Sequence, residues 1–219
     1  MQVAFPYPVR VVSSVPKPEG FRMEPFTNID GEPFARPTLN GRWRVDMQII
    51  ARGMQAQLAL SAFNTAMSGN GTCVIPICTQ WRPNDSNGRM LARGGVAPEY
   101  TFDHVGFAND PFDGFTLRSP AARRNSFIDV NKPALSQLWP GHLISLGDRL
   151  HHVVKVSAID DSETAIRVSV VPSIREDHDA GAVVIVDQLR LKVQMESGEP
   201  IGFGVAPMKF SNMSFIEAF

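Results

Sequence analysis

Residues 43–78 hold the clearest patterning in the chain, and the rest of the fold is expected to form around them. In residues 43–49 every second side chain is apolar, which is the period of a strand with one face against a core. Residues 54–67 change to a helical period, in which apolar side chains recur on one face. These side chains are Ala56, Leu60, Phe63 and Met67. The helix is expected to end at Gly69, where a Ser-Gly-Asn-Gly turn precedes an apolar strand at residues 73–78.

The last third of the chain has the pattern of successive strands. Residues 143–146 and 150–156 flank the turn dipeptide Gly147-Asp148 and predict a hairpin. Further alternating or apolar stretches predict strands at residues 166–170, 183–186 and 189–195. A last strand ends at Phe219, and an apolar chain end of this kind is expected to be tied into a sheet or an interface.

One helix against about eight to ten strands indicates a mainly β protein. We expect a β-sandwich or a partly closed barrel with one packed α-helix over about residues 54–67. Residues 1–42 are expected to form an N-terminal arm with entry strands. Residues 43–219 would then form one β-rich domain with a long irregular insertion at about residues 79–139, so that the chain is a single domain overall.

The N-terminal residues 1–42 contain seven prolines. Because proline lacks a backbone donor, this segment fits an edge strand or an extended arm better than a central strand. Apolar side chains near its start alternate with polar residues or proline and need something to cover them. These side chains are Phe5, Tyr7, Val9 and Val11. The segment is either a decorated tail or an arm that docks on a neighbouring subunit.

Residues 79–139 show no persuasive helix or long strand, although residues 114–118 and 127–130 have the pattern of short strands. Aromatic side chains are spread along the segment, which sets it apart from a disordered one. It is either an excursion packed on its own domain or a loop that reaches an adjacent subunit or partner through aromatic anchors. The anchor candidates are Trp81, Phe112 and Phe115, together with Phe219 at the chain end.

Composition narrows the class of protein. A hydrophobic content of 43%, a charged content of 20% and a net charge of -1 give no global reason to expect sequence-specific nucleic-acid binding or membrane insertion. There is no run of 18 apolar residues, and the first residues lack the order of a signal peptide. We therefore expect synthesis in a cytoplasm, with Cys73 and Cys78 as small buried thiols, although a bend at Pro76 leaves a disulfide open.

The sequence carries no recognisable catalytic motif. It has no nucleophile elbow, phosphate-binding loop or zinc-binding helix. His151 and His152 are adjacent, so on a strand they point to opposite faces. His104 lies beside Asp103 without an identifiable third partner, and the acidic residues around Asp160 fit a solvated turn. We predict a protein that is not an enzyme and has no catalytic residue, cofactor or metal.

Five short segments occur in an order that resembles the distal tail proteins of long-tailed, non-contractile bacteriophages, the siphophages. They are GRWRVD at residues 41–46, Ala62-Phe63 in the helix, SLGDRLHHV at 145–153, IRVSVVPSIR at 166–175 and MSFIEAF at 213–219. The likeness covers residues 43–71 and 143–219, a little under half of the chain. The resemblance implies a β-sandwich with a helix and an extended hairpin, assembled as a ring, usually of six copies, at the distal end of the tail tube.

A protein of this kind would be a virion component of the tail tip or baseplate. Its partners would be other copies of itself, the tail tube protein and the tail-tip hub or fibre proteins. Residues 5–12 and part of residues 79–139 would lie at subunit contacts. Because DNA passes through the ring without sticking, the lumen should be neutral or acidic, and a lumen lined by Arg42, Arg44 or Arg123 would count against this placement.

Two other classes of function stay open. A receptor- or carbohydrate-binding module of the tail would also be a β-sandwich, with Trp81, Tyr100 or Trp139 exposed to stack on sugar rings. An enzyme such as a cell-wall hydrolase would need acidic or imidazole groups that converge, and nothing in the sequence gives a reason for His104 and Asp148 to meet.

Overall fold

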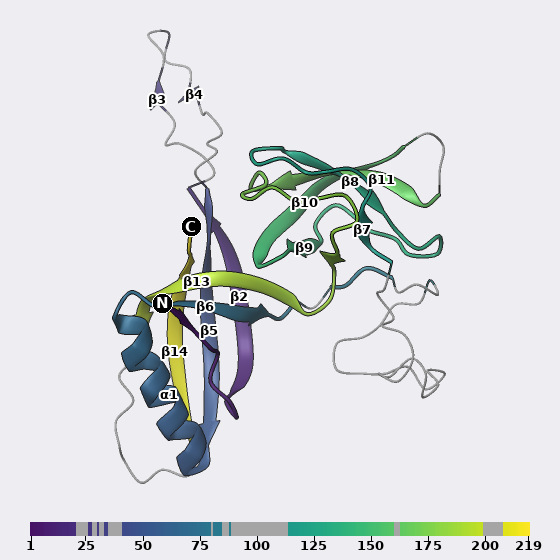
Figure 1. Ribbon diagram of the computed structural model, residues 1–219. Helices are drawn as coiled ribbons and strands as arrows, with labels where there is room; N and C mark the ends of the chain where they lie inside the picture. Colours follow the sequence, from purple (N-terminus) through teal and green to yellow (C-terminus); the bar gives the residue numbers. More distant parts are fainter. Residues whose placement is uncertain are drawn as a thin grey trace. The chain divides into compact units, whose positions relative to one another are not determined.

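The computed structural model describes residues 1–20, 26–27, 30, 33–34, 41–79, 81–84, 88, 114–159, 163–198 and 208–219. The chain divides into two compact units (Figure 1). Unit 1 consists of Met1–Cys78 and Arg190–Phe219, and unit 2 consists of Thr79–Leu189. Strands dominate the described residues and one α-helix accompanies them, which confirms the predicted mainly β fold class.

Unit 1 is built on a six-stranded sheet with the order β1-β6-β13-β14-β5-β2. Its strands are β1 (Gln2–Val3), β2 (Arg10–Glu19), β5 (Arg42–Arg52), β6 (Thr72–Ile77), β13 (Leu189–Gly198) and β14 (Met208–Glu217). A short antiparallel pair, β3 (Phe26–Thr27) with β4 (Pro33–Phe34), lies between β2 and β5 in the chain. The prediction that the C-terminus is tied into a sheet is confirmed, because residues 208–216 of β14 pair with residues 44–52 of β5.

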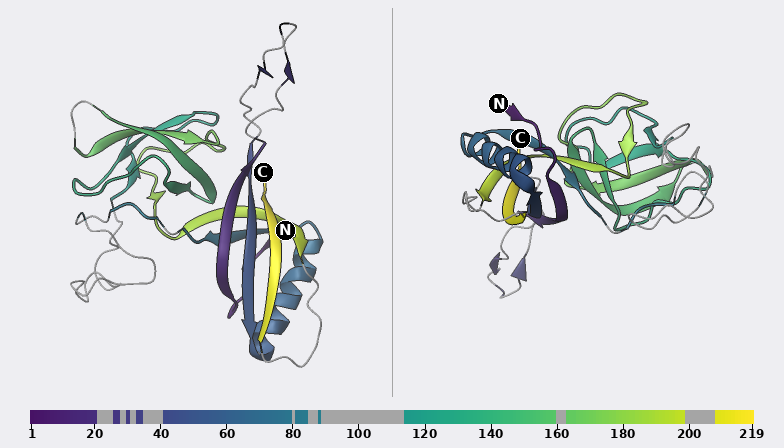
Figure 2. Two further views of the ribbon diagram at one scale, coloured as in Figure 1. Left: turned by 180° about the vertical axis from the view of Figure 1, so that it is seen from behind. Right: turned by 90° about the horizontal axis from the view of Figure 1, so that it is seen from below.

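The sheet of unit 1 folds over on itself. Figures 1 and 2 show β6 and β13 running across β5, β14 and β2 rather than alongside them. Just beyond β6, the backbone N–H of Cys78 donates to the hydroxyl of Ser14 in β2 at 2.7 Å, although three strands separate β2 from β6 in the sheet order. The apolar faces of the two halves therefore enclose one core.

The helix α1 (Gly53–Ser68) follows β5 directly and ends at the predicted position within one residue. Its four buried side chains are the predicted ones, Ala56, Leu60, Phe63 and Met67. The ring of Phe63 lies 6.5 Å from that of Phe215 in β14 and 5.9 Å from that of Phe5. Burying a large apolar side chain stabilises the fold by about 1.5–3 kcal/mol. Packing therefore holds the helix, whose N-terminus has no side-chain cap.

Unit 2 is a nearly closed barrel with the strand order β12-β9-β10-β11-β8-β7. Its strands are β7 (Thr116–Leu117), β8 (Phe127–Asn131), β9 (Leu143–Leu146), β10 (Arg149–Ala158), β11 (Ala165–Val171) and β12 (Val184–Ile185). The predicted hairpin is confirmed as β9 and β10. The two edges meet because the N–H of Leu117 donates to Ala182 and the N–H of Val184 donates to Phe115, each at 2.9 Å.

The segment at residues 79–139 is organised differently from the prediction. We expected one domain with an irregular insertion there, whereas the structure groups Thr79–Leu189 into a unit of its own. The reason lies in the pairing: β11 pairs with β8, and β8 with β7, so the strands after residue 143 join those of the insertion. The described part of the insertion, beyond residue 113, is thus one wall of the barrel.

Gly71 lies between α1 and β6, where β1 and the end of α1 come close to the backbone. A Cβ atom on Gly71 would lie 2.9 Å from the carbonyl oxygen of Ala66 and 3.0 Å from Cγ2 of Val3. Because a backbone oxygen held by the helix cannot yield alone, we expect Gly71→Ala to lower the free energy of unfolding by about 1–3 kcal/mol. The control is Gly69→Ala, where φ is -88° and the nearest atom to a Cβ lies at 3.8 Å. Urea denaturation of both variants provides the measurement, and equal losses would contradict the prediction.

Candidate interaction surfaces

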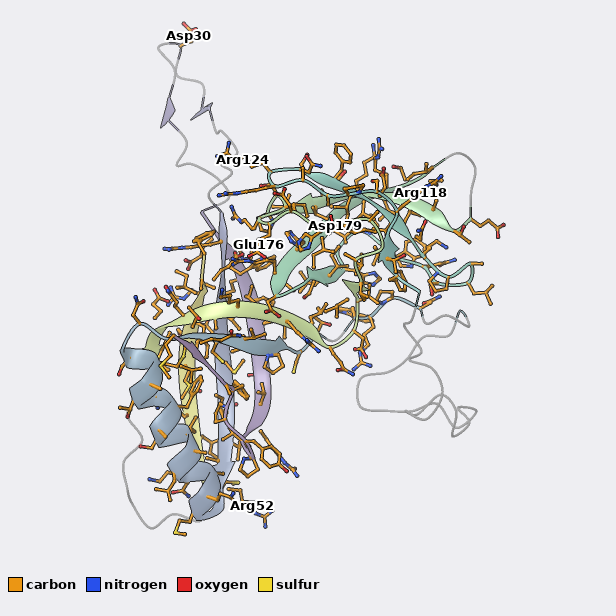
Figure 3. The ribbon with its side chains drawn as sticks, in the orientation of Figure 1. Asp30, Arg52, Arg118, Arg124, Glu176 and Asp179 are labelled. Atoms are coloured by element: carbon orange, nitrogen blue, oxygen red, sulfur yellow. The ribbon has the colours of Figure 1, made fainter. Side chains whose placement is uncertain are left out.

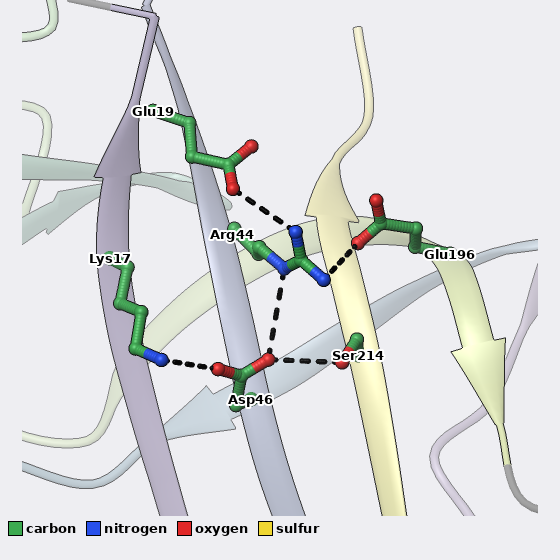
Figure 4. A network of polar contacts seen from close by, with 6 residues as sticks. All are labelled: Lys17, Glu19, Arg44, Asp46, Glu196 and Ser214. Atoms are coloured by element: carbon green, nitrogen blue, oxygen red, sulfur yellow. Dashed lines mark hydrogen bonds and ion pairs between the residues drawn. The ribbon is translucent and has the colours of Figure 1, made fainter.

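The outer face of β5 carries a network of charged side chains (Figure 4). Alternation along this strand buries Trp43, Val45 and the residues that follow in step, and it leaves Arg44 and Asp46 on the opposite face. The guanidinium of Arg44 lies 3.2 Å from a carboxylate oxygen of Glu19, 3.2 Å from one of Glu196 and 3.8 Å from one of Asp46. One arginine therefore meets three acidic groups from three strands.

The network extends to the edge of the sheet through Asp46. Its carboxylate accepts a hydrogen bond from Lys17 at 2.6 Å and another from the hydroxyl of Ser214 at 3.0 Å. Glu196 on β13 reaches Arg44 on β5 across β14, which lies between these strands in the sheet order. The hydrogen bond from Lys17 is the main cause that lowers the pKa of Asp46, and the hydrogen bond to Glu19 is the main cause that raises the pKa of Arg44.

The charges of this network nearly cancel. Lys17 and Arg44 contribute two positive charges and Glu19, Asp46 and Glu196 contribute three negative ones, which leaves a net charge of -1. The side chain of Arg44 is 35% exposed, and each of its partners is also partly exposed, so the network holds strands in register rather than adding much stability.

The other end of the same face combines large apolar side chains with two exposed arginines, Arg52 on β5 and Arg10 on β2. Ile50 on β5 pairs with Phe210 on β14, and Arg52 pairs with Met208. The side chain of Phe210 is 55% exposed and that of Met208 is 46% exposed. Along the strands the face thus passes from a network of paired charges to exposed apolar side chains flanked by arginines.

The predicted subunit contacts in the N-terminal segment differ in exposure. Tyr7 is 87% exposed, whereas Phe5, Val9 and Val11 are half-buried. Phe5 uses part of its ring to pack on Phe63 of α1. Tyr7 is therefore the member of this group whose side chain lies fully available on the surface.

The predicted aromatic anchors outside the N-terminal segment also differ in exposure. Trp81 is 68% exposed and Phe219 is 70% exposed. Phe115 was wrongly taken for an anchor, because its side chain is 1% exposed and belongs to the core of the barrel. Its neighbour Leu117 points into the same core, as alternation in a short strand requires. Phe112 lies outside the described residues.

A buried histidine lies in the barrel. His151 on β10 is fully buried, and its Nδ1 lies 2.9 Å from the carbonyl oxygen of Pro172, so Nδ1 carries the proton and donates it. Burial lowers the pKa of His151 to about 4, and the nearby charges of His178, Arg175 and Arg149 act in the same direction. His152 is exposed, which confirms that the adjacent pair faces opposite sides.

Two ion pairs of the barrel join its strands to neighbouring segments. Nε and Nη2 of the buried Arg149 both donate to Glu176, which Figure 3 labels, at 3.0 and 2.9 Å. Arg167 makes two hydrogen bonds with Asp129, at 2.8 and 3.0 Å, and its guanidinium lies 4.6 Å from the centre of the Phe127 ring. These contacts are structural.

Metal-ligating side chains do not cluster among the described residues. No group of three or more His, Cys, Asp or Glu side chains among them could hold a metal ion. Both cysteines are free thiols, and burial raises the pKa of Cys73 to about 12, where the thiol is unreactive at neutral pH. The candidates Asp103, His104 and Asp160 lie outside the described residues.

His151 makes the stability of the barrel depend on pH. Since its pKa is about 4 in the folded protein and 6.5 in an ordinary environment, unfolding takes up a proton between these values. The stabilisation is fully present above pH 6.5, and roughly 3 kcal/mol is lost as the pH falls through 4. Hydrogen exchange of the β10 amides at several pH values measures this loss. We expect His151→Gln to flatten the pH dependence and the exposed control His152→Gln to leave it unchanged; the reverse result would contradict the assignment.

Comparisons with known proteins provide no family for this chain. No family model matches the sequence, and no curated protein matches it. Within the described part of the chain, no helix is long and apolar enough to cross a bilayer. Any function must therefore be argued from the surfaces of the two units.

Proposed function

We propose that this chain is a structural virion protein that forms a ring, of six copies as in the family it resembles, at the distal end of a phage tail tube. The ring would connect the tube to the tail tip or baseplate and to fibres. The observation that carries the proposal is the exposure of Tyr7, Trp81 and Phe219, three large side chains that an isolated protein leaves in water. Exposed aromatic side chains suit a subunit that works by contact with its neighbours.

The framework of unit 1 supports this role. Three of the five segments that resemble the distal tail proteins overlap framework elements of unit 1: residues 41–46 overlap β5, 62–63 lie in α1 and 213–219 overlap β14. The other two, residues 145–153 and 166–175, overlap strands of unit 2. The connection between β2 and β5 contains the antiparallel pair β3 and β4, as expected for the extended hairpin of that family. A ring subunit needs a rigid framework and surfaces that bind its neighbours, and it needs no reactive centre.

Electrostatics on the outer face of β5 are compatible with a channel for DNA. Arg42, Arg44 and Arg123 were the residues expected to count against such a wall, because an unpaired arginine binds phosphate. Arg42 is exposed at the end of β5, and Arg123 is exposed in unit 2. Arg44 is the one that belongs to the network. It is surrounded by three carboxylates, and the network it belongs to has a net charge of -1. A wall with this charge would let the duplex pass without strong attraction. The protein would then be found in the virion, after synthesis in the host cytoplasm.

Mass measurement of the purified protein tests the proposal. We expect light scattering to give a closed oligomer and negative-stain images to show rings, while Tyr7→Asp and Phe219→Asp should weaken assembly by at least tenfold, because a charge at an apolar contact is not solvated. Val183→Asp is the control, since Val183 is 65% exposed on unit 2 and outside the predicted contacts. A protein that stays monomeric at high concentration and is missing from purified particles would refute the proposal.

A second candidate function is a receptor- or carbohydrate-binding module of the tail. Two tryptophans of unit 2 favour it, because Trp81 is 68% exposed and Trp139 is 58% exposed. The backbone of Trp139 is fixed by its N–H, which donates to Nδ1 of His142 at 3.0 Å. An exposed indole on a fixed turn can stack on a sugar ring without first being ordered.

Glycan binding distinguishes this candidate from the ring. If unit 2 binds carbohydrate, Trp139→Ala or Trp81→Ala should weaken binding to an array hit by at least tenfold, because each stacked ring contributes on the order of 1 kcal/mol or more. Leu135→Ala is the matched control, since Leu135 is 61% exposed in the same unit. An array without any hit for the wild-type protein would remove this candidate and leave the ring untouched.

A further inference from the structure

Two stretches of the chain contain no charged side chain. Neither residues 53–81 nor residues 1–9 include an Asp, Glu, Lys or Arg, although these types make up 20% of the sequence. The longer stretch contains the whole of α1, which is a surface helix. A helix whose outer side stays in water normally carries charged residues there.

The two uncharged stretches lie together in unit 1. The backbone N–H of Thr72 donates to the carbonyl of Met1 at 2.9 Å, and β1 pairs with β6 in the residues that follow. The ring of Phe5 packs against Phe63 of α1. The N-terminal segment therefore borders the helix, and their exposed residues form one continuous area, which we term the uncharged surface.

The exposed side of α1 forms the centre of the uncharged surface. Its exposed residues include Met54, Gln55, Leu58, Ala62, Thr65 and Ala66. Met54 is 79% exposed and Leu58 is 52% exposed, and Tyr7 on the bordering segment is 87% exposed. Leu58, Ala62 and Ala66 follow each other at intervals of four residues, so they form one ridge along the helix. Two alanines in this ridge leave room for another backbone to come close.

We infer that the uncharged surface binds a second copy of this chain, with α1 of one copy packed on α1 of the other. The argument is electrostatic. A charged partner would lose the hydration of its charges against a surface that offers no counter-charge, which costs several kcal/mol for each buried ion. The outer face of β5 in another copy is such a charged partner. The same surface in another copy brings no charged side chain into the contact, and the terminal amine of Met1, which is 95% exposed, can stay in water.

The geometry of α1 fits a two-fold contact of this kind. Helices with small residues on the facing ridge pack with their axes about 8–10 Å apart. In a two-fold contact each copy presents the same patch, so Leu58 of one copy lies near the helix of the other. The contact differs from the head-to-tail contacts that close a ring, so this inference goes beyond the proposed function and does not depend on it.

A single charge on the ridge tests the inference. Leu58→Glu places a carboxylate at the centre of the contact, while an exposed Glu on a helix leaves the fold intact. Sedimentation of the wild-type protein over a range of concentrations should show two-fold association, and Leu58→Glu should weaken it by at least tenfold. Val154→Glu is the matched control, because Val154 is also 52% exposed but belongs to unit 2. An equal effect of both variants, or none of Leu58→Glu, would overturn the inference.

Two further measurements separate a two-fold contact from other occupants. Mixing Leu58→Glu with Leu58→Lys should restore association, because opposite charges then face each other across the two-fold axis. In a Cys78→Ser background, Ala62→Cys should form a disulfide-linked dimer under mild oxidation and Val154→Cys should not. A wild-type protein that shows no association through α1 would mean that a different protein covers this surface, and it would overturn the inference. Rings that persist in Leu58→Glu while the two-fold association is lost would support the inference and leave the proposed function intact, whereas loss of the rings themselves would overturn the assignment of α1 to a separate two-fold contact.

Discussion

The pairing of β5 with β14 is the constraint on which the rest of the structure depends. It joins residues 42–52 to the last strand of the chain through nine antiparallel residue pairs. Because these two strands lie side by side, a unit inserted between them in the sequence must leave the sheet and return to it without separating them. Unit 2 does so, since it follows β6 and precedes most of β13, and β6 and β13 are neighbours in the sheet. The insertion of a whole barrel therefore does not disturb the sheet.

The same strand also explains how unit 1 has two different faces. Every second side chain of β5 is fully buried, and the α1 helix that follows packs near it through Phe63 and three other apolar residues. This much could be predicted from the sequence, because a period of two followed by a helical period specifies which side chains meet. The hairpin of β9 and β10 was predictable for a similar reason, since Gly147 at a φ of 57° marks its turn.

Contacts between distant segments could not be predicted in this way. The barrel closes through the two-residue strand β7 and the backbone around Ala182, and these residues have no pattern that links them. Phe115 shows the consequence, because without the closing contact an aromatic residue in an irregular segment resembles an exposed anchor. The Arg44 network could not be predicted from the sequence either, because it also joins distant segments. Its members come from four strands, and alternation reveals only that Arg44 faces away from the core.

Two surfaces of unit 1, the Arg44 network on β5 and the uncharged surface around α1, both carry few unpaired charges, but for different reasons. In the Arg44 network on the outer face of β5, charges are present but paired within the subunit. On α1 no charge is present at all. Neither surface produces a strong field, so neither can steer a partner from a distance, and the screening of charges by salt has little to act on. Selectivity at such surfaces has to come from shape and from apolar side chains that fit, as Tyr7 and Leu58 could supply. Assembly by fit rather than by charge suits a subunit that must bind its own kind and let a polyanion pass.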